Sequence, residues 1–185
     1  CPCTTTRMDG RATYFRSTET SFLVFRDKAM TGLRACATFV VSAFCALCFS
    51  ERPPNVIVIL ADDMGYGDLS CYGNTRFATP NLDRLASEGV RFTNFYTASP
   101  GCSPARAALL TGCYPQRVSV PHVLMPNSPT GLNPAESTIA DLLRERGYAT
   151  AMVGKWHIGA TPALMPLSHG FDEYYGLPYS NDMWP

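Results

Sequence analysis

The sequence predicts an α/β fold in which a mainly parallel β-sheet is flanked by helices. Three observations carry this prediction: strand-like and helix-like segments alternate after residue 53, apolar residues make up 46% of the chain, and charged residues only 16%. Alternation of this kind is typical of βαβ units, and this apolar content is typical of globular domains. A chain of 185 residues is long enough to form one domain with a hydrophobic core.

Three segments have the composition of strands. Residues 55–61 (NVIVILA) form a continuous apolar run, as expected for a central parallel strand that is buried on both faces. Residues 90–96 have the aromatic and β-branched character of a second strand, and residues 148–153 that of a third.

Three further segments have the pattern of helices. A helix is predicted to begin at Pro80 and to end at Gly89, because proline favours the first turn and glycine the position after the last. Residues 103–110 form a second, apolar helix. A third is predicted over residues 137–146, with its leucines on one face and a glycine directly after it.

Residues 30–50 have the features of a secretory signal peptide. A short basic start ends at Arg34, residues 35–49 are apolar and nearly uncharged, and small residues follow. The run is too short for a stable membrane span, which needs about 20 residues; a buried core helix is the alternative. We therefore expect export to a periplasmic, extracellular or lysosome-like compartment, and we expect residues 1–29 to be a non-native or upstream leader.

Net charge and cysteine content argue against several classes of protein. The 15 basic residues balance the 15 acidic ones, which argues against nucleic acid as a partner. After residue 50 only Cys71, Cys102 and Cys113 remain, too few for a disulfide scaffold or a cysteine-rich zinc site. A bridge between Cys71 and Cys113 is left open.

The segment from Cys102 to Arg106 (CSPAR) places a thiol and a guanidinium at the start of the second helix. One helical turn separates them, so both can lie on one face. A helix N-terminus also favours anions, because its backbone N–H groups are unpaired. The alternative for the motif alone is a buried or disulfide-bonded cysteine before an ordinary helix.

Asp62 and Asp63 follow the apolar run 55–61 directly. Neighbouring carboxylates repel each other unless a cation or hydrogen-bond donors compensate them. Oxygen ligands of this type suit Ca²⁺ or Mg²⁺ rather than Zn²⁺. A solvated acidic turn is the alternative.

Lys155 and His157 follow the predicted strand 148–153. Because ligands of open α/β sheets bind outside the carboxyl ends of the strands, we expect them near the two aspartates. A cation and an imidazole suit the binding of an anionic ester and the handling of a proton. The alternative is a surface lysine with a structural histidine. His122 and His169 lie in proline-rich loops and have a weaker claim to a role.

The Cys-x-Pro-x-Arg motif resembles the sulfatase signature, and further blocks are similar to sulfatase blocks in the same order. The resemblance covers roughly residues 52–185, and it implies an alkaline-phosphatase-like fold, of which residues 51–185 would be the N-terminal, incomplete part of the catalytic domain. The similar blocks are residues 55–63, 79–83, 102–112, 147–159, 170–172 and 176–182.

The resemblance implies a role for each matched residue. Cys102 would be oxidised by a formylglycine-generating enzyme to formylglycine, whose hydrate is the nucleophile and also touches the metal. Asp62 and Asp63 would be ligands of Ca²⁺, with Mg²⁺ less expected. Arg106 would hold the hydrate.

The remaining roles concern the sulfate group. The resemblance implies that Lys155 binds the sulfate and the nucleophile, that His157 helps to release sulfate after turnover, and that Ser180 contacts the sulfate. Cys113 and Ser119 depart from the family pattern, which often has a basic residue and a glycine at these positions.

The expected function is therefore hydrolysis of sulfate esters on a small molecule or a polysaccharide. Hydrolysis of phosphonate monoesters or phosphodiesters by the same nucleophile, and a non-catalytic binding protein, are the alternatives. The family also uses a downstream Asp-Asn pair, a lysine and a histidine that are not found before Pro185, so we expect this 185-residue piece alone to be inactive.

Overall fold

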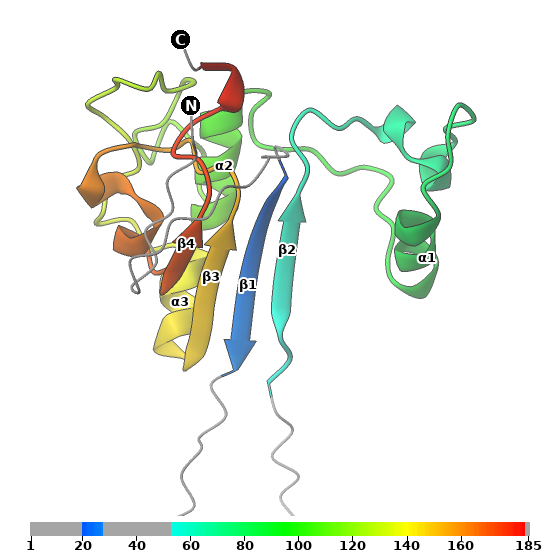
Figure 1. Cartoon of the computed structure of the whole chain (residues 1–185), viewed down its shortest axis with the longest axis horizontal. Coiled ribbons are helices and arrows are strands. Elements are labelled where there is room, and N and C mark those ends of the chain that lie inside the picture. Colours follow the sequence, from blue (N-terminus) through cyan, green and yellow to red (C-terminus); the bar gives the residue numbers. More distant parts are fainter. Residues whose placement is uncertain (1–19, 28–52, 184–185) are drawn as a thin grey trace, which may run out of the picture.

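The computed structural model describes residues 20–27 and 53–183 (Figure 1). The predicted signal peptide at 30–50 and most of the predicted leader at 1–29 lie outside the described residues, and both stay predictions. Among the described residues, no helix is long and apolar enough to cross a membrane.

A four-stranded sheet organises the described residues, in the order β2-β1-β3-β4. Strand β1 is antiparallel to both β2 and β3, and β4 is parallel to β3, so β2, β3 and β4 share one direction and β1 opposes them. The predicted α/β fold is confirmed, and its sheet is mixed. The strands are β1 (Ser21–Asp27), β2 (Val56–Leu60), β3 (Tyr148–Val153) and β4 (Glu173–Tyr175).

Strand β1 comes from the segment that we expected to be a leader. Its side chains alternate: Ser21, Leu23 and Phe25 are buried, and the residues between them are exposed or half-buried. This period of two is that of a strand with one face on the core. The sequence did not predict this strand because its apolar stretch is only four residues long. Periodicity alone cannot assign so short a run to a strand or to a helix.

The strand predicted over 55–61 forms as β2, but the prediction that it is central and buried on both faces is wrong for the described residues. It lies at the edge of the sheet, and Ile57 and Ile59 are 60% and 57% exposed. Among the described residues, helices lie against only one face of the sheet, so a continuous apolar run here leaves every second side chain uncovered (Figure 1).

All three predicted helices are confirmed, with small shifts at their ends. They are α1 (Pro80–Glu88), α2 (Cys102–Thr111) and α3 (Ile139–Glu145). Helix α3 begins in a capping box, in which the Thr138 hydroxyl accepts from the Asp141 N–H. Helices α2 and α3 pack against the sheet through Ala107, Leu110 and Ala140. Helix α1 lies apart, at the end of a long excursion from β2 (Figure 1).

The prediction of a strand over residues 90–96 is wrong. This segment is irregular, and Phe92 and Phe95 are 60% and 62% exposed. Its backbone groups bond to tyrosine hydroxyls instead of a neighbouring strand: Tyr66 Oη donates to the Phe95 carbonyl at 2.8 Å, and Tyr72 Oη to the Phe92 carbonyl at 2.7 Å. Residues 90–96 therefore have the composition of a strand but pair with no neighbouring strand among the described residues.

Short 3₁₀ helices occupy the connections. They are η1 (Tyr66–Asp68), η2 (Ser70–Tyr72), η3 (Pro162–Leu164), η4 (Pro166–Ser168) and η5 (Asn181–Met183).

Candidate active site

The two predicted polar clusters meet at one end of the sheet. Because β2 and β3 run in the same direction, their carboxyl ends lie at the same edge, and Asp62 and Lys155 each follow their strand by two residues. Lys155 Nζ donates to Asp62 Oδ2 at 2.5 Å. The expectation that these clusters form one site is therefore met by a direct ion pair.

Helix α2 adds a second cation to the same carboxylate. Arg106 Nη2 lies 3.4 Å from Asp62 Oδ2, and the Arg106 and Lys155 side chains are only 4% and 3% exposed. Charges buried in this way interact far more strongly than charges in water. The three groups together carry one net positive charge, which suits an anionic ester.

The segment after β3 is held rigidly. Trp156 N donates to the Leu177 carbonyl at 2.8 Å, and Leu177 N donates to the Gly154 carbonyl at 3.2 Å, so pairing continues beyond β3 and β4. The Trp156 side chain is 1% exposed and its Nε1 donates to the Leu164 carbonyl at 2.7 Å. The backbone at Lys155 is therefore held in place by its neighbour Trp156, whose side chain is buried and hydrogen-bonded.

Gly154 shows why this segment needs glycine. Its φ is +114°, and a Cβ there would lie 2.5 Å from the Thr20 carbonyl oxygen. The backbone of β1 therefore passes close to the start of the site, and any side chain at Gly154 would displace it.

His157 is a buried, neutral imidazole. Its Nε2 lies 2.8 Å from the Leu124 carbonyl, and since a carbonyl only accepts, Nε2 carries the proton and donates. Among the described residues, Nδ1 has no hydrogen-bond partner. Burial lowers the pKa of His157; the Leu124 contact opposes this, while Lys155 and Arg106 lower the pKa further. Nδ1 is thus a free base at neutral pH.

Cys102 is the first residue of α2, half-buried and with a free thiol. The Gly101 carbonyl accepts from Ala105 N at 3.0 Å, which closes the first turn and places Arg106 one turn after the thiol. Cys71 and Cys113 are also free, so the bridge that the sequence left open is not formed.

Asp63 follows Asp62 in an unusual conformation. It is exposed, and its φ is +57°, in the left-handed region that His157 also occupies with φ of +60°. Such conformations cost energy and are concentrated at functional sites. No group of three or more His, Cys, Asp or Glu side chains among the described residues lies close enough together to hold a metal ion.

Ser180 is 4% exposed. It is hydrogen-bonded to Asp182, a residue to which the sequence analysis assigned no role. The pKa of Asp182 is lowered, first because of its side-chain hydrogen bond with Ser180, and also by the positive charge of Lys155. Asp182 is exposed and is joined to the candidate site through Ser180. Its position two residues after Ser180, in a block already singled out, was the available signal.

The two remaining histidines differ in their surroundings. His122 is exposed. His169 is fully buried, with its ring centroid 5.6 Å from that of Trp156. Neither His169 ring nitrogen has a hydrogen-bond partner among the described residues. His169 thus packs against Trp156, the residue that follows Lys155.

Comparison with known proteins matches this chain to one family. A family model described as Sulfatase matches residues 54–185. Human arylsulfatase A is 53% identical over 137 residues, which is 72% of this chain and 27% of that protein. Mouse steryl-sulfatase is 51% identical over 144 residues, 71% of this chain and 23% of that protein. Human N-acetylgalactosamine-6-sulfatase is 47% identical over 137 residues, 70% of this chain and 26% of that protein. The chain therefore spans about a quarter of these relatives.

A solved structure agrees in fold. The crystal structure of Ps i-CgsB is similar with a TM-score of 0.62 and 43% sequence identity, covering 64% of this chain and 27% of that one. A structure of Ps i-CgsB with k-i-k-neocarrahexaose is similar with a TM-score of 0.62 and 42% identity, covering the same shares of the two chains.

Proposed function

Because this chain belongs to the sulfatase family, we propose that it supplies the nucleophile and the anion-binding groups of an active site that hydrolyses sulfate esters. One observation carries the proposal most strongly. Asp62, Arg106 and Lys155 come from three separate parts of the chain and meet as a group with net positive charge, in which both cations are buried and the carboxylate is half-buried. Cys102 precedes Arg106 by one helical turn.

The proposed nucleophile derives from Cys102. We propose that a formylglycine-generating enzyme converts it to formylglycine, whose hydrate supplies an oxygen nucleophile. Cys102 is a half-buried, free cysteine at the start of α2. The helix N-terminus also favours the negative charge that the nucleophile and the sulfate bring.

The surrounding residues would divide the remaining work. Arg106 orients the nucleophile, and Lys155 binds the sulfate oxygens, whose negative charge increases in the transition state. His157 takes a proton at Nδ1, because its Nε2–H is already directed to the Leu124 carbonyl. Ser180 contacts the sulfate together with Lys155.

Calcium would complete the site. Asp62 and Asp63 offer the hard oxygen donors that Ca²⁺ prefers, and formylglycine at position 102 would add another; Mg²⁺ is the alternative. Bound calcium would stabilise negative charge on the ester. Asp62 and Asp63 account for only part of the six to eight ligands usual for Ca²⁺, so the donor type fits and the shell is incomplete in the described residues.

The proposed substrate class is defined only by the sulfate ester that reacts. Relatives named for aryl, steryl and N-acetylgalactosamine-6-sulfate activities are 53%, 51% and 47% identical to this chain. The matched segment therefore does not separate their substrates, and we propose a sulfated small molecule or polysaccharide without choosing between them. The signal-like segment 30–50 supports export as part of the proposal.

Mass spectrometry of two neighbouring tryptic peptides tests the proposal. The chain is co-expressed with a formylglycine-generating enzyme, beside a reference sulfatase. We expect an aldehyde in the peptide of residues 92–106 and an unmodified thiol at Cys113 in the peptide of residues 107–117. An unmodified Cys102, in a sample where the reference sulfatase is converted, contradicts the proposal and favours a non-catalytic binding protein.

A further inference from the structure

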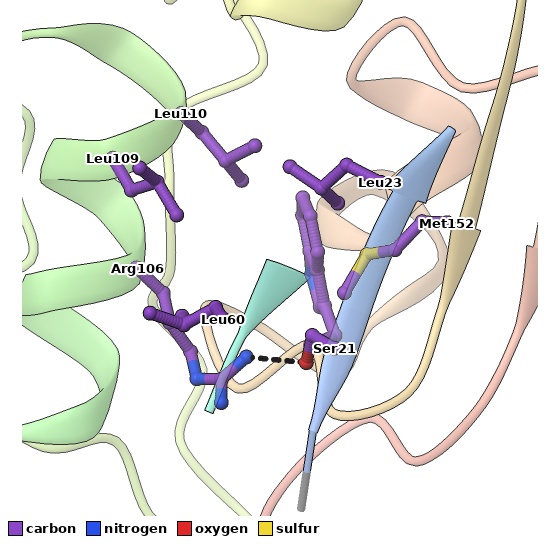
Figure 2. Close-up of a pocket in the computed structure, with 8 residues that line it drawn as sticks. Ser21, Leu23, Leu60, Arg106, Leu109, Leu110 and Met152 are labelled. Atoms are coloured by element: carbon purple, nitrogen blue, oxygen red, sulfur yellow. Dashed lines mark hydrogen bonds between the residues drawn. The ribbon is translucent and has the colours of Figure 1, made fainter. Parts of the chain in front are cut away.

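Ser103 is a buried residue at the start of α2 that the proposed function does not use. It directly follows Cys102, and its side chain is fully buried. Figure 2 shows Arg106, on the same helix, directed toward the strands. The Ser103 hydroxyl instead contacts the irregular segment 121–125, since its Oγ accepts from Leu124 N at 2.9 Å. Helix α2 therefore holds this segment from a position next to the proposed nucleophile.

A second contact places the segment 121–125 against the start of α2. A Cβ added at Gly101 would lie 3.1 Å from Val123 Cγ2, so glycine leaves the room that the segment needs. Val123 and Met125 are themselves 41% and 63% exposed. Burial of these two side chains therefore does little to hold the segment, and the hydrogen bonds of Leu124 become more important for its position.

The backbone of Leu124 links Ser103 to His157. Its N–H donates to Ser103 Oγ, and its carbonyl accepts from His157 Nε2 at 2.8 Å. Among the described residues, that carbonyl is the only hydrogen-bond partner of the His157 ring, because Nδ1 has none. A displacement of Leu124 would therefore change the one hydrogen bond that orients the ring.

We propose that Ser103 is a positioning residue that acts through Leu124 to orient the His157 imidazole, with Nε2 protonated and Nδ1 left free as the base. The hydrogen bond at one ring nitrogen decides which of the two carries the proton. The role of His157 as a base rests on the proposed function; the hydrogen-bonded orientation does not. All three residues follow the signal-like segment 30–50, so the linkage remains in a protein from which that segment has been removed.

Hydrogen exchange followed by NMR tests this role. The full chain is isotope-labelled; it contains three histidines, and the His157 Nε2 proton is assigned by its loss in His157→Gln. Ser103→Ala removes the hydroxyl that accepts from Leu124 N. We expect both the Leu124 amide proton and the His157 Nε2 proton to exchange with water about 10-fold faster, the factor that corresponds to about 1.4 kcal/mol for a lost hydrogen bond.

Thr150→Val is the matched control. Thr150 is 1% exposed and its Oγ1 accepts from Asp172 N at 2.9 Å, so this variant also removes a buried hydroxyl that is bonded to a backbone N–H. Neither proton should exchange faster in it. The same acceleration in Thr150→Val would mean that any lost buried hydroxyl loosens the fold, and it would overturn the proposal. Unchanged exchange at His157 Nε2 in Ser103→Ala, even with acceleration at the Leu124 amide, would also overturn it.

A measurement on the parent chain decides the question if Ser103→Ala does not fold. If one local opening releases both the Leu124 amide and the His157 Nε2 proton, their exchange should accelerate in parallel in low urea. A different urea dependence of the two protons overturns the proposal. All of these measurements use the unmodified Cys102 thiol. A missing aldehyde at Cys102 therefore refutes the proposed function and leaves the role of Ser103 to be decided by hydrogen exchange.

Discussion

Replacing Lys155 with methionine removes the nearest positive charge from the Asp62 carboxylate and keeps most of the side-chain volume. Breaking a buried ion pair costs about 3–5 kcal/mol, because the remaining charge stays buried without its partner. Asp62 would retain Arg106 Nη2 at 3.4 Å. We therefore expect the lower end of this range, a loss of about 3 kcal/mol in the free energy of unfolding.

A double-mutant cycle with Asp62→Asn measures the pair itself. Urea unfolding followed by circular dichroism gives the free energy of unfolding for the parent, both single variants and the double variant. We expect the double variant to be less destabilised than the two single losses added together, by about 2 kcal/mol, because neither charge of the pair then remains.

An exposed ion pair provides the matched control. Arg84 and Glu88 lie one turn apart on α1 with 3.7 Å between Nε and Oε1, and their side chains are 75% and 67% exposed. The cycle with Arg84→Met and Glu88→Gln should give a coupling of only about 0.3–0.5 kcal/mol. A coupling between Asp62 and Lys155 as small as this would refute the buried ion pair as an organising element of the site.

Two further predictions concern stability. Burial lowers the pKa of His169, and Asp141 opposes this shift. Below the ordinary pKa of 6.5, this histidine therefore binds protons more readily in the unfolded protein than in the folded one. The free energy of unfolding should consequently fall as the pH decreases below that value. His169→Gln should reduce this slope by up to about 1.4 kcal/mol per pH unit in thermal or urea unfolding, and an unchanged slope would contradict the assignment. Ser119 is exposed with φ of +64°, so Ser119→Gly should raise the free energy of unfolding by about 1 kcal/mol. Ser137→Gly, at an exposed position without positive φ, should lower it slightly; a gain of equal size there would point to a cause other than backbone strain.

Local signals in the sequence were sufficient for the helices. Pro80 and Gly89 bound α1, and Gly147, with φ of +84°, follows α3. These residues act through their own backbone preferences, which need no distant partner. The same holds for Ser119, whose left-handed backbone explains why a glycine was expected at that position.

Pairing between distant segments could not be predicted in this way. Residues 90–96 have strand composition and form no strand, while residues 21–27 pair with both β2 and β3. Whether a short apolar run becomes a strand depends on a neighbour that offers hydrogen bonds, and β propensity is correspondingly sensitive to context.

The sequence by itself determined which residue types the candidate site contains, and the tertiary structure decided how they are arranged. The motif at Cys102 and Arg106 and the residues Asp62, Lys155 and His157 indicated the chemistry because side-chain type and local spacing are properties of the chain itself. Only folding brought Lys155 to Asp62, 93 residues away. Contacts over such separations are selected by burial and strand pairing, which no local pattern encodes.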